Sequence, residues 1–288
     1  MILAEARREL GGRVTAEAGL PGLSEWARVR DYRVQQLHKL ANVGIYLESE
    51  LAADDVLAVG AEHVAIATGA AWRRDGLGRA NLRGIAPLDP AARIFTPDDV
   101  MAGRLPQGRA LIFDDDGYYM AAVVAERVAE TAEDVTLVTP EEGVAAWAAY
   151  TGERPRTLAR LRECGVKTVV SRNLEGFDGS AAQLVCTLTG AAERLPADAL
   201  VLVTAREPED SLYRELADRT EAGVEGAPHS LRRIGDCEAP AIIAAAVYAG
   251  HRYARELDAP ETDATAVPHD RPFDEDPSSA LVSTASGR

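Results

Sequence analysis

Residues 109–140 constrain the fold most strongly, because they show a complete strand–turn–helix–strand pattern. The run RALIF is short and apolar, the following DDDG is an acidic turn, and the valines of MAAVVAERVAE recur at helical spacing. The run DVTLVTP is again a short apolar strand. Two strands joined in this way by a helix pair in parallel through a right-handed crossover. We therefore expect a βαβ unit at this place.

Strands and helices alternate through the rest of the chain as well. The expected segments are a short buried strand within 62–72, a helix at 157–165, strands at 166–172, 182–190 and 197–206, and a strand, a Gly-Asp turn and a long helix from about Pro240 within 231–258. Such alternation is typical of an α/β protein with parallel sheets. Residues 259–288 are rich in acids, prolines, serine and threonine, and we expect a disordered tail there.

Composition excludes several classes of function. The formal net charge of −15 opposes binding to nucleic acid or to an anionic membrane. We find no run of 18 apolar residues and no signal peptide, so a soluble, cytoplasmic protein is expected. The three cysteines and five histidines show no metal-ligand spacing, and there is no GxSxG or Walker motif. We therefore predict no metal site and no catalytic residue.

The first candidate site lies in the opening stretch MILAEARRELGGRV. A short strand ends at Glu5, as in the second strand of a nucleotide-binding unit, where an acid accepts hydrogen bonds from ribose hydroxyls. Gly11 and Gly12 allow positive φ and close approach of a phosphate, and Arg13 has the charge to pair with it. A solvated Glu5, a plain glycine loop and a surface Arg13 are the alternatives. The Gly-rich loop that normally lies some 20 residues earlier is absent.

A second candidate site lies where two later strands end. Ala67, Thr68 and Gly69 end one strand with small residues, at the edge of the sheet where open α/β folds bind ligands. Gly235 and Asp236 end another, and a helix follows them. Ala239 and Pro240 suit the start of that helix, and a helix-start role explains Asp236 almost as well as ligand binding does.

Several of these motifs together resemble a known family. The segments LGGRV…LPGLSEW, DDDGYYMA and IGDCEAPAIIAAAVYAGHRYARELD, with ATG near residue 68, are similar to the C-terminal half of the trimethylamine dehydrogenase and 2,4-dienoyl-CoA reductase group of NADH:flavin oxidoreductases. The likeness runs from residue 1 to about 258. In that group a TIM barrel holds FMN and the catalytic residues, a four-cysteine 4Fe-4S cluster follows, and FAD- or ADP-binding and NAD-like domains end the chain.

The resemblance implies two Rossmann-like domains of the FAD/NAD(P)-binding type, the second inserted in the first. The expected boundaries are 1–104 with 196–258 for the first domain and 105–195 for the second. The resemblance also implies that the first domain lacks its first strand. FMN and the 4Fe-4S cluster would belong to a part outside this chain. Its cofactor would be FAD or ADP, bound weakly, with Asp236 at the ribitol or pyrophosphate.

The second domain departs from a nucleotide-binding pattern. Where GxGxxG belongs, the turn 114–119 offers only Gly117, and Tyr118 and Tyr119 are too bulky for a diphosphate to lie against the backbone. Three aspartates are expected to place negative charge at the mouth, and one like-charge pair at ~5 Å costs about 3 kcal/mol at an effective dielectric of ~20. Members of the group that oxidise amines do not use NAD(P)H. We therefore predict a degenerate, structural domain or an interaction surface.

Three functions remain open. The chain is the nucleotide-binding portion of an FMN/Fe-S oxidoreductase acting on N-methylated amines or similar compounds, a non-catalytic FAD- or ADP-binding subunit that docks on a separate barrel-bearing chain, or a decayed fragment. In each case we expect the isolated chain to be inactive. We also expect it to associate with itself or with a partner through the place of its first strand.

Overall fold

The computed structural model describes residues 1–86, 88–89 and 91–257. Met1–Gly250 form one compact unit, to which the description below refers. The expected tail at 259–288 lies outside the described residues. Within the described part of the chain, no helix is both long and apolar enough to span a membrane.

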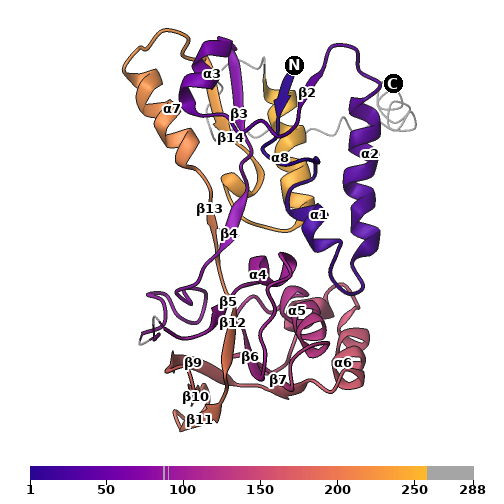
Figure 1. Ribbon diagram of the computed structural model, residues 1–288, viewed down its shortest axis with the longest axis vertical. Coiled ribbons are helices and arrows are strands. Elements are labelled where there is room, and N and C mark those ends of the chain that lie inside the picture. Colours follow the sequence, from indigo (N-terminus) through magenta and orange to yellow (C-terminus); the bar gives the residue numbers. More distant parts are fainter. Residues whose placement is uncertain (87, 90, 258–288) are drawn as a thin grey trace, which may run out of the picture. The chain divides into compact units, whose positions relative to one another are not determined.

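The largest sheet has five parallel strands in the order β5-β12-β6-β7-β8 (Figure 1). Its strands are β5 (Ile94–Phe95), β6 (Arg109–Asp114), β7 (Asp134–Val138), β8 (Lys167–Val169) and β12 (Ala199–Val203). All of β12 and all of β6 after its first residue are buried, as expected for central parallel strands covered on both faces. Helix α5 (Met120–Ala129) connects β6 to β7. The predicted βαβ unit is therefore confirmed.

Two further helices and one further sheet complete this part of the molecule. The helices are α4 (Pro97–Met101) and α6 (Arg154–Glu163), and a short 3₁₀ turn, η2, spans Ala146–Ala149. The sheet is antiparallel, with order β11-β10-β9: β9 (Arg172–Phe177), β10 (Ala181–Cys186) and β11 (Ala192–Pro196). Leu174, Phe177 and Leu184 of this sheet share one buried cluster with Leu111 and Leu200. We call residues 73–205 the second lobe.

The first lobe comprises residues 1–12, 27–69 and 209–250 and is built on two separate pairs of parallel strands. Strand β1 (Ile2–Ala4) pairs with β2 (Gly44–Tyr46), and β3 (His63–Ile66) pairs with β14 (Ser230–Arg233). Its helices are α2 (Ala27–Leu37), α3 (Ala53–Val59), α7 (Ser211–Glu221) and α8 (Ile243–Glu256), with a 3₁₀ turn, η3, at Gly235–Cys237. Among the described residues, no ladder joins the two strand pairs.

Two connections link the lobes. The ribbon consists of β4 (Ala70–Trp72) and β13 (Arg206–Pro208), which pair antiparallel and lie side by side in Figure 1. The bridging segment, residues 13–26, contains α1 (Arg13–Glu17) and the 3₁₀ turn η1 (Ser24–Trp26). Leu20 and Leu23 of this segment belong to the same buried cluster as Val124 and Val128 of α5. The bridging segment therefore packs on the second lobe.

The strands of the five-stranded sheet do not follow the expected domain boundaries at 104/105 and 195/196. Strands β5 and β12 fall in the sequence ranges assigned to the first domain, yet both belong to the five-stranded sheet of the second lobe. A short apolar parallel strand carries no local signal of the sheet that it joins. Only the pairing of β12 with β6 and β5 decides the assignment.

Candidate functional site

Glu5 lies directly after β1, as the sequence predicted. Its backbone continues the pairing with the second strand, because the Glu5 N–H donates to the Tyr46 carbonyl at 2.9 Å and the Ser49 N–H donates to the Glu5 carbonyl at 2.9 Å. The Arg7 N–H donates to Glu5 Oε1 at 2.9 Å. The carboxylate is thus held at the end of the strand by the turn that follows it.

Gly11 and Gly12 both have positive φ, of 115° and 51°. At Gly11 an added Cβ would lie 2.5 Å from Thr15 Oγ1 and 2.7 Å from Arg30 Cδ, so those side chains would have to shift, and the positive φ itself favours glycine. At Gly12 an added Cβ would meet no protein atom within 4 Å. A pocket of about 290 Å³ opens beside it and is lined by Arg7, Arg8, Glu9, Gly12, Thr15 and Ala16. Gly12, but not Gly11, therefore lines this pocket.

The second group of predicted residues meets at the ends of β3 and β14. Ile66 pairs with Arg233, and the Ile234 N–H donates to the Ile66 carbonyl, so the two strands end side by side. The Thr68 hydroxyl donates to the Glu209 carbonyl. Helix α8 begins at Ile243 rather than at Pro240, and η3 occupies Gly235–Cys237 before it. Ala239 bonds back to the Gly235 carbonyl at 3.0 Å.

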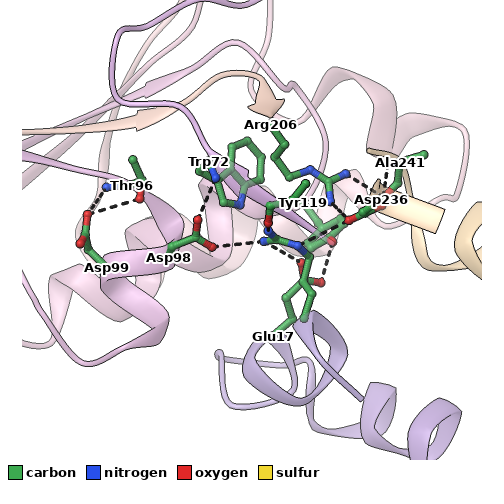
Figure 2. Close-up of polar contacts among 11 residues, drawn as sticks. Glu17, Trp72, Thr96, Asp98, Asp99, Tyr119, Arg206, Asp236 and Ala241 are labelled. Atoms are coloured by element: carbon green, nitrogen blue, oxygen red, sulfur yellow. Dashed lines mark hydrogen bonds and ion pairs between the residues drawn. The ribbon is translucent and has the colours of Figure 1, made fainter. Parts of the chain in front are cut away.

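Asp236 is bound by groups of this chain. Its carboxylate accepts a hydrogen bond of 2.5 Å from Arg206 Nη1 and one of 3.0 Å from the Ala241 N–H (Figure 2). Arg206 also donates to the Ala241 carbonyl at 2.7 Å and lies over the Trp72 ring, 5.5 Å from its centroid. The sequence analysis missed Arg206, because a basic residue after a buried strand gives no local sign of its partner.

Arg13 connects both groups of predicted residues and the ribbon. Its Nη2 donates to the Ala70 carbonyl at 2.6 Å, and its Nη1 lies 3.4 Å from Asp98 Oδ1. Arg13 Nε is 3.6 Å from Asp236 Oδ2 and is buried without a hydrogen-bond partner. The guanidinium thus lies among acceptors from both lobes, where the sequence predicted a phosphate contact or a surface position.

Glu17 is a buried carboxyl group that the sequence analysis did not identify. It is 2% exposed and accepts a hydrogen bond of 2.9 Å from the Tyr119 hydroxyl of the second lobe (Figure 2). Burial raises the pKa of Glu17, opposed by the Tyr119 hydrogen bond and by Arg13. Burial and the neighbouring Glu17 raise the pKa of Tyr119. The Tyr119 ring also contacts Trp26 edge-on, with centroids 4.6 Å apart.

The acidic turn of the second lobe differs from its expected form. Asp114 and Asp115 point inward, at 1% and 2% exposure, and accept hydrogen bonds from the Gly117 and Ala80 N–H groups. Burial raises the pKa of Asp114 to about 7. The expectation of three charges projecting at the mouth was therefore wrong, because short carboxylates after a strand are captured by nearby backbone donors.

Side chains of this chain also cover the turn. Arg79 Nε donates to the Asp115 carbonyl at 2.8 Å, and the backbone N–H of Trp147 donates to the Gly117 carbonyl at 3.0 Å. A Cβ added to Gly117 would lie 3.1 Å from Arg79 Nη2 and 3.2 Å from Trp147 Cδ1. The space where a phosphate would approach this glycine is thus filled. Among the described residues, no group of three or more His, Cys, Asp or Glu side chains is arranged to hold a metal ion.

Comparison with known proteins finds a family model that matches part of this chain. Residues 95–176 match the family model of the OYE-like second alpha/beta domain. The matched segment runs from the end of β5 into β9, and so lies within the second lobe. The α/β class with a parallel sheet is confirmed by the pairing itself.

Relatives extend the likeness over most of the chain. This chain is 37% identical over 281 residues to dimethylamine dehydrogenase of Hyphomicrobium sp. (strain x). The alignment covers 89% of this chain and 38% of that protein. Histamine dehydrogenase from Rhizobium sp. 4-9 superposes with a TM-score of 0.88 at 42% identity, over 91% of this chain and 41% of that one. The 6-hydroxypseudooxynicotine amine oxidase of Pseudomonas geniculata N1 gives 0.81 at 40% identity, over 86% and 37%.

The chain therefore spans about two-fifths of the length of these relatives. It is similar to a part of amine-oxidising enzymes. A thioredoxin reductase from T. acidophilum, at 14% identity and a TM-score of 0.51, shares the fold alone.

Proposed function

We propose that this chain is the C-terminal, adenine-nucleotide-binding portion of a flavin-dependent amine oxidoreductase. Support comes from the identities of 37%, 40% and 42% with proteins that are each named for an amine substrate. The substrate class would be N-methylated or similar amines, in line with the dimethylamine dehydrogenase and with a probable N-methylproline demethylase of Rhizobium meliloti (strain 1021), 26% identical over 89% of this chain and 40% of that protein. The oxidation itself would be carried out on a barrel-bearing part outside this chain.

The pocket beside Gly12 is the observation that carries the nucleotide assignment. Its lining combines a backbone that can be approached closely at Gly12 with the positive charges of Arg7 and Arg8, beside the acidic Glu9, and the carboxylate of Glu5, outside the lining, comes just before them in the chain. A diphosphate needs the first two features, and the hydroxyls of a ribose need an acceptor such as the third. A volume of about 290 Å³ suits part of a mononucleotide.

The contacts of Asp236 favour ADP over FAD. Arg206 and the Ala241 N–H use both carboxylate oxygens of Asp236, and Arg13 Nε lies 3.6 Å away. The side chains of Arg13, Arg206 and Asp236 are only 18%, 15% and 14% exposed. A ribitol chain would have to displace this ion-pair cluster, whereas the adenosine half of a nucleotide would not.

Calorimetric titration of the chain with ADP tests the proposal. We expect saturable binding, weakened at least about ten-fold by Glu5→Ala, because a hydrogen bond to a charged group is worth about 1.5–3 kcal/mol. Glu50→Ala removes an exposed carboxylate that does not line the pocket and should leave the affinity unchanged. FAD should bind more weakly than ADP. Absence of heat with ADP at millimolar concentration would refute the nucleotide assignment.

A separate, non-catalytic subunit is the second candidate function. It is favoured by the edges of the first lobe, where β1 pairs with β2 and β14 pairs with β3, and each has one edge without a ladder among the described residues. A partner chain, or a second copy, that adds a strand there would satisfy those backbone groups. Co-purification with a separately encoded barrel chain would distinguish this candidate from a continuous enzyme.

A further inference from the structure

The pocket beside Gly12 has two walls of different origin. One wall, Arg7–Glu9, follows β1 and belongs to the first lobe. The other is α1, which contributes Thr15 and Ala16 just after Gly12. The shape of the pocket therefore depends on the contacts that hold α1 in place.

The face of α1 that does not line the pocket is bonded to the second lobe. Arg13 and Glu17 are four residues apart and so lie on one face of the helix. Glu17 bonds Tyr119 at the start of α5, and Arg13 Nη1 lies 3.4 Å from Asp98 on α4. In Figure 2, Asp98 and Asp236 lie on either side of the cluster that also contains Arg206, and Glu17 lies below it.

The residues after α1 strengthen the same attachment. Leu20 and Leu23 are 5% and 8% exposed and belong to the core cluster of the second lobe. Trp26 packs on the Tyr119 ring. Arg13 also bonds the Ala70 carbonyl of the ribbon. The pocket wall is thus anchored to the second lobe and to the ribbon through Arg13 and Glu17. Thr15 ties the same helix to the first lobe, because its hydroxyl donates to the Leu10 carbonyl at 3.1 Å and accepts from Arg30 Nη1 at 3.1 Å.

We propose that α1 couples occupation of the pocket to the junction between the lobes. A helix of five residues has too few internal hydrogen bonds to hold its own position, so its side-chain contacts must do so. A ligand that restrains the Thr15 and Ala16 face will therefore also restrain the Arg13 and Glu17 face. Coupling of this kind is reciprocal, so loosening the junction must weaken binding. The identity of the ligand, but not the coupling, rests on the proposed function.

The first experiment needs no ligand. Amide hydrogen exchange is measured on the full chain for the wild type, Tyr119→Phe and Tyr118→Phe. Tyr119→Phe removes the hydroxyl bonded to Glu17, whereas Tyr118→Phe removes the same atom from a side chain outside that hydrogen bond. We expect several-fold faster exchange at residues 11–16 and in the ribbon with Tyr119→Phe only. Unchanged exchange at residues 11–16 would overturn the coupling.

The second experiment uses ADP as the probe. We expect ADP to slow exchange at the ribbon and at residues 117–123 in the wild type, and Tyr119→Phe to weaken ADP binding about five-fold or more, the lower end of typical coupling. Equal ADP affinities in Tyr119→Phe and Tyr118→Phe would overturn the coupling while leaving the nucleotide assignment intact. If the wild type does not bind ADP but exchange at 11–16 responds to Tyr119→Phe, the coupling stands and the nucleotide assignment fails.

Discussion

Asp114 is a carboxyl group that the fold holds away from water. It is 1% exposed, and its Oδ2 is buried without a hydrogen-bond partner in the described part of the chain. Burial raises its pKa from 3.8 to about 7, with Asp115 and Asp116 adding repulsion. The folded chain therefore keeps a proton that the unfolded chain releases between about pH 4 and pH 7, so this group's contribution to stability falls as pH rises through that range.

The substitution Asp114→Asn should remove this loss of folding stability with rising pH. Asparagine keeps an oxygen to accept the Gly117 N–H and cannot ionise. We expect the variant and the wild type to melt alike below about pH 4, where both states of the wild type keep the proton, and the variant to melt several degrees higher at pH 8, since the full shift corresponds to a free energy on the order of a few kcal/mol. Thermal melts at intervals of pH check this. A difference in melting temperature that does not change with pH would contradict the assigned cause.

Arg206 is expected to stabilise the fold far more than a surface arginine does. Its side chain is 15% exposed, and it bonds both Asp236 and the Ala241 carbonyl. Arg206→Ala leaves Asp236 half-buried without its main partner and should lower the free energy of unfolding by about 1–3 kcal/mol. Arg214→Ala removes a 75% exposed partner of Asp210 and should cost about 0–1 kcal/mol. Urea unfolding of both variants measures the contrast, and equal losses would contradict it.

The turn between β6 and α5 should exclude dinucleotides from the second lobe. Arg79 and Trp147 fill the space beside Gly117, where a phosphate would have to approach the backbone. The Tyr119 hydroxyl is already hydrogen-bonded to Glu17. We expect NADH to bind more weakly than about 1 mM, about −4 kcal/mol in binding free energy. Calorimetry with NADH is the test. Micromolar affinity that is lost on altering residues 114–119 would show that this turn does bind a dinucleotide.

Among the helices and strands, those whose signal lies in adjacent residues were predicted correctly from the sequence. Strand β6, helix α5 and strand β7 were predicted because their apolar residues follow each other at the right period, and β10 because it alternates. Strand β11, AERLP, is mostly exposed and polar and gave no such signal. The contact of Glu17 with Tyr119 joins residues 102 positions apart, so no local pattern contains it. The residues proposed for the candidate site were therefore those with a local signal, namely strand ends, a glycine pair with the arginine after it, and a helix start, whereas Glu17 and Arg206 had none.

The first lobe has a much smaller core than the second. Its buried cluster consists of Ala53, Val56, Leu57, Ile66, Leu216 and Cys237, and α8 has no fully buried residue although one side of it is apolar. Ile2 on β1 and Tyr248 on α8 are 56% and 57% exposed. Backbone groups at the free edges of β1 and β14 add to this exposure. The first lobe is therefore where added structure would stabilise the molecule most.

Adding a strand–GxGxxG–helix unit before Met1 tests that view of the whole molecule. In a Rossmann sheet a strand of this type lies between the second strand and the return strand, the positions that β1 and β14 would take, and its loop binds the pyrophosphate. We expect the extended chain to melt at a higher temperature and to bind ADP more tightly. A matched extension with proline in the middle of the new strand cannot complete a ladder and should do neither. If the 288-residue chain is already monomeric, melts cooperatively above about 60 °C, near the top of the range for ordinary mesophilic domains, and gains several degrees from ADP, then its own residues fill the gap and the extension will add nothing.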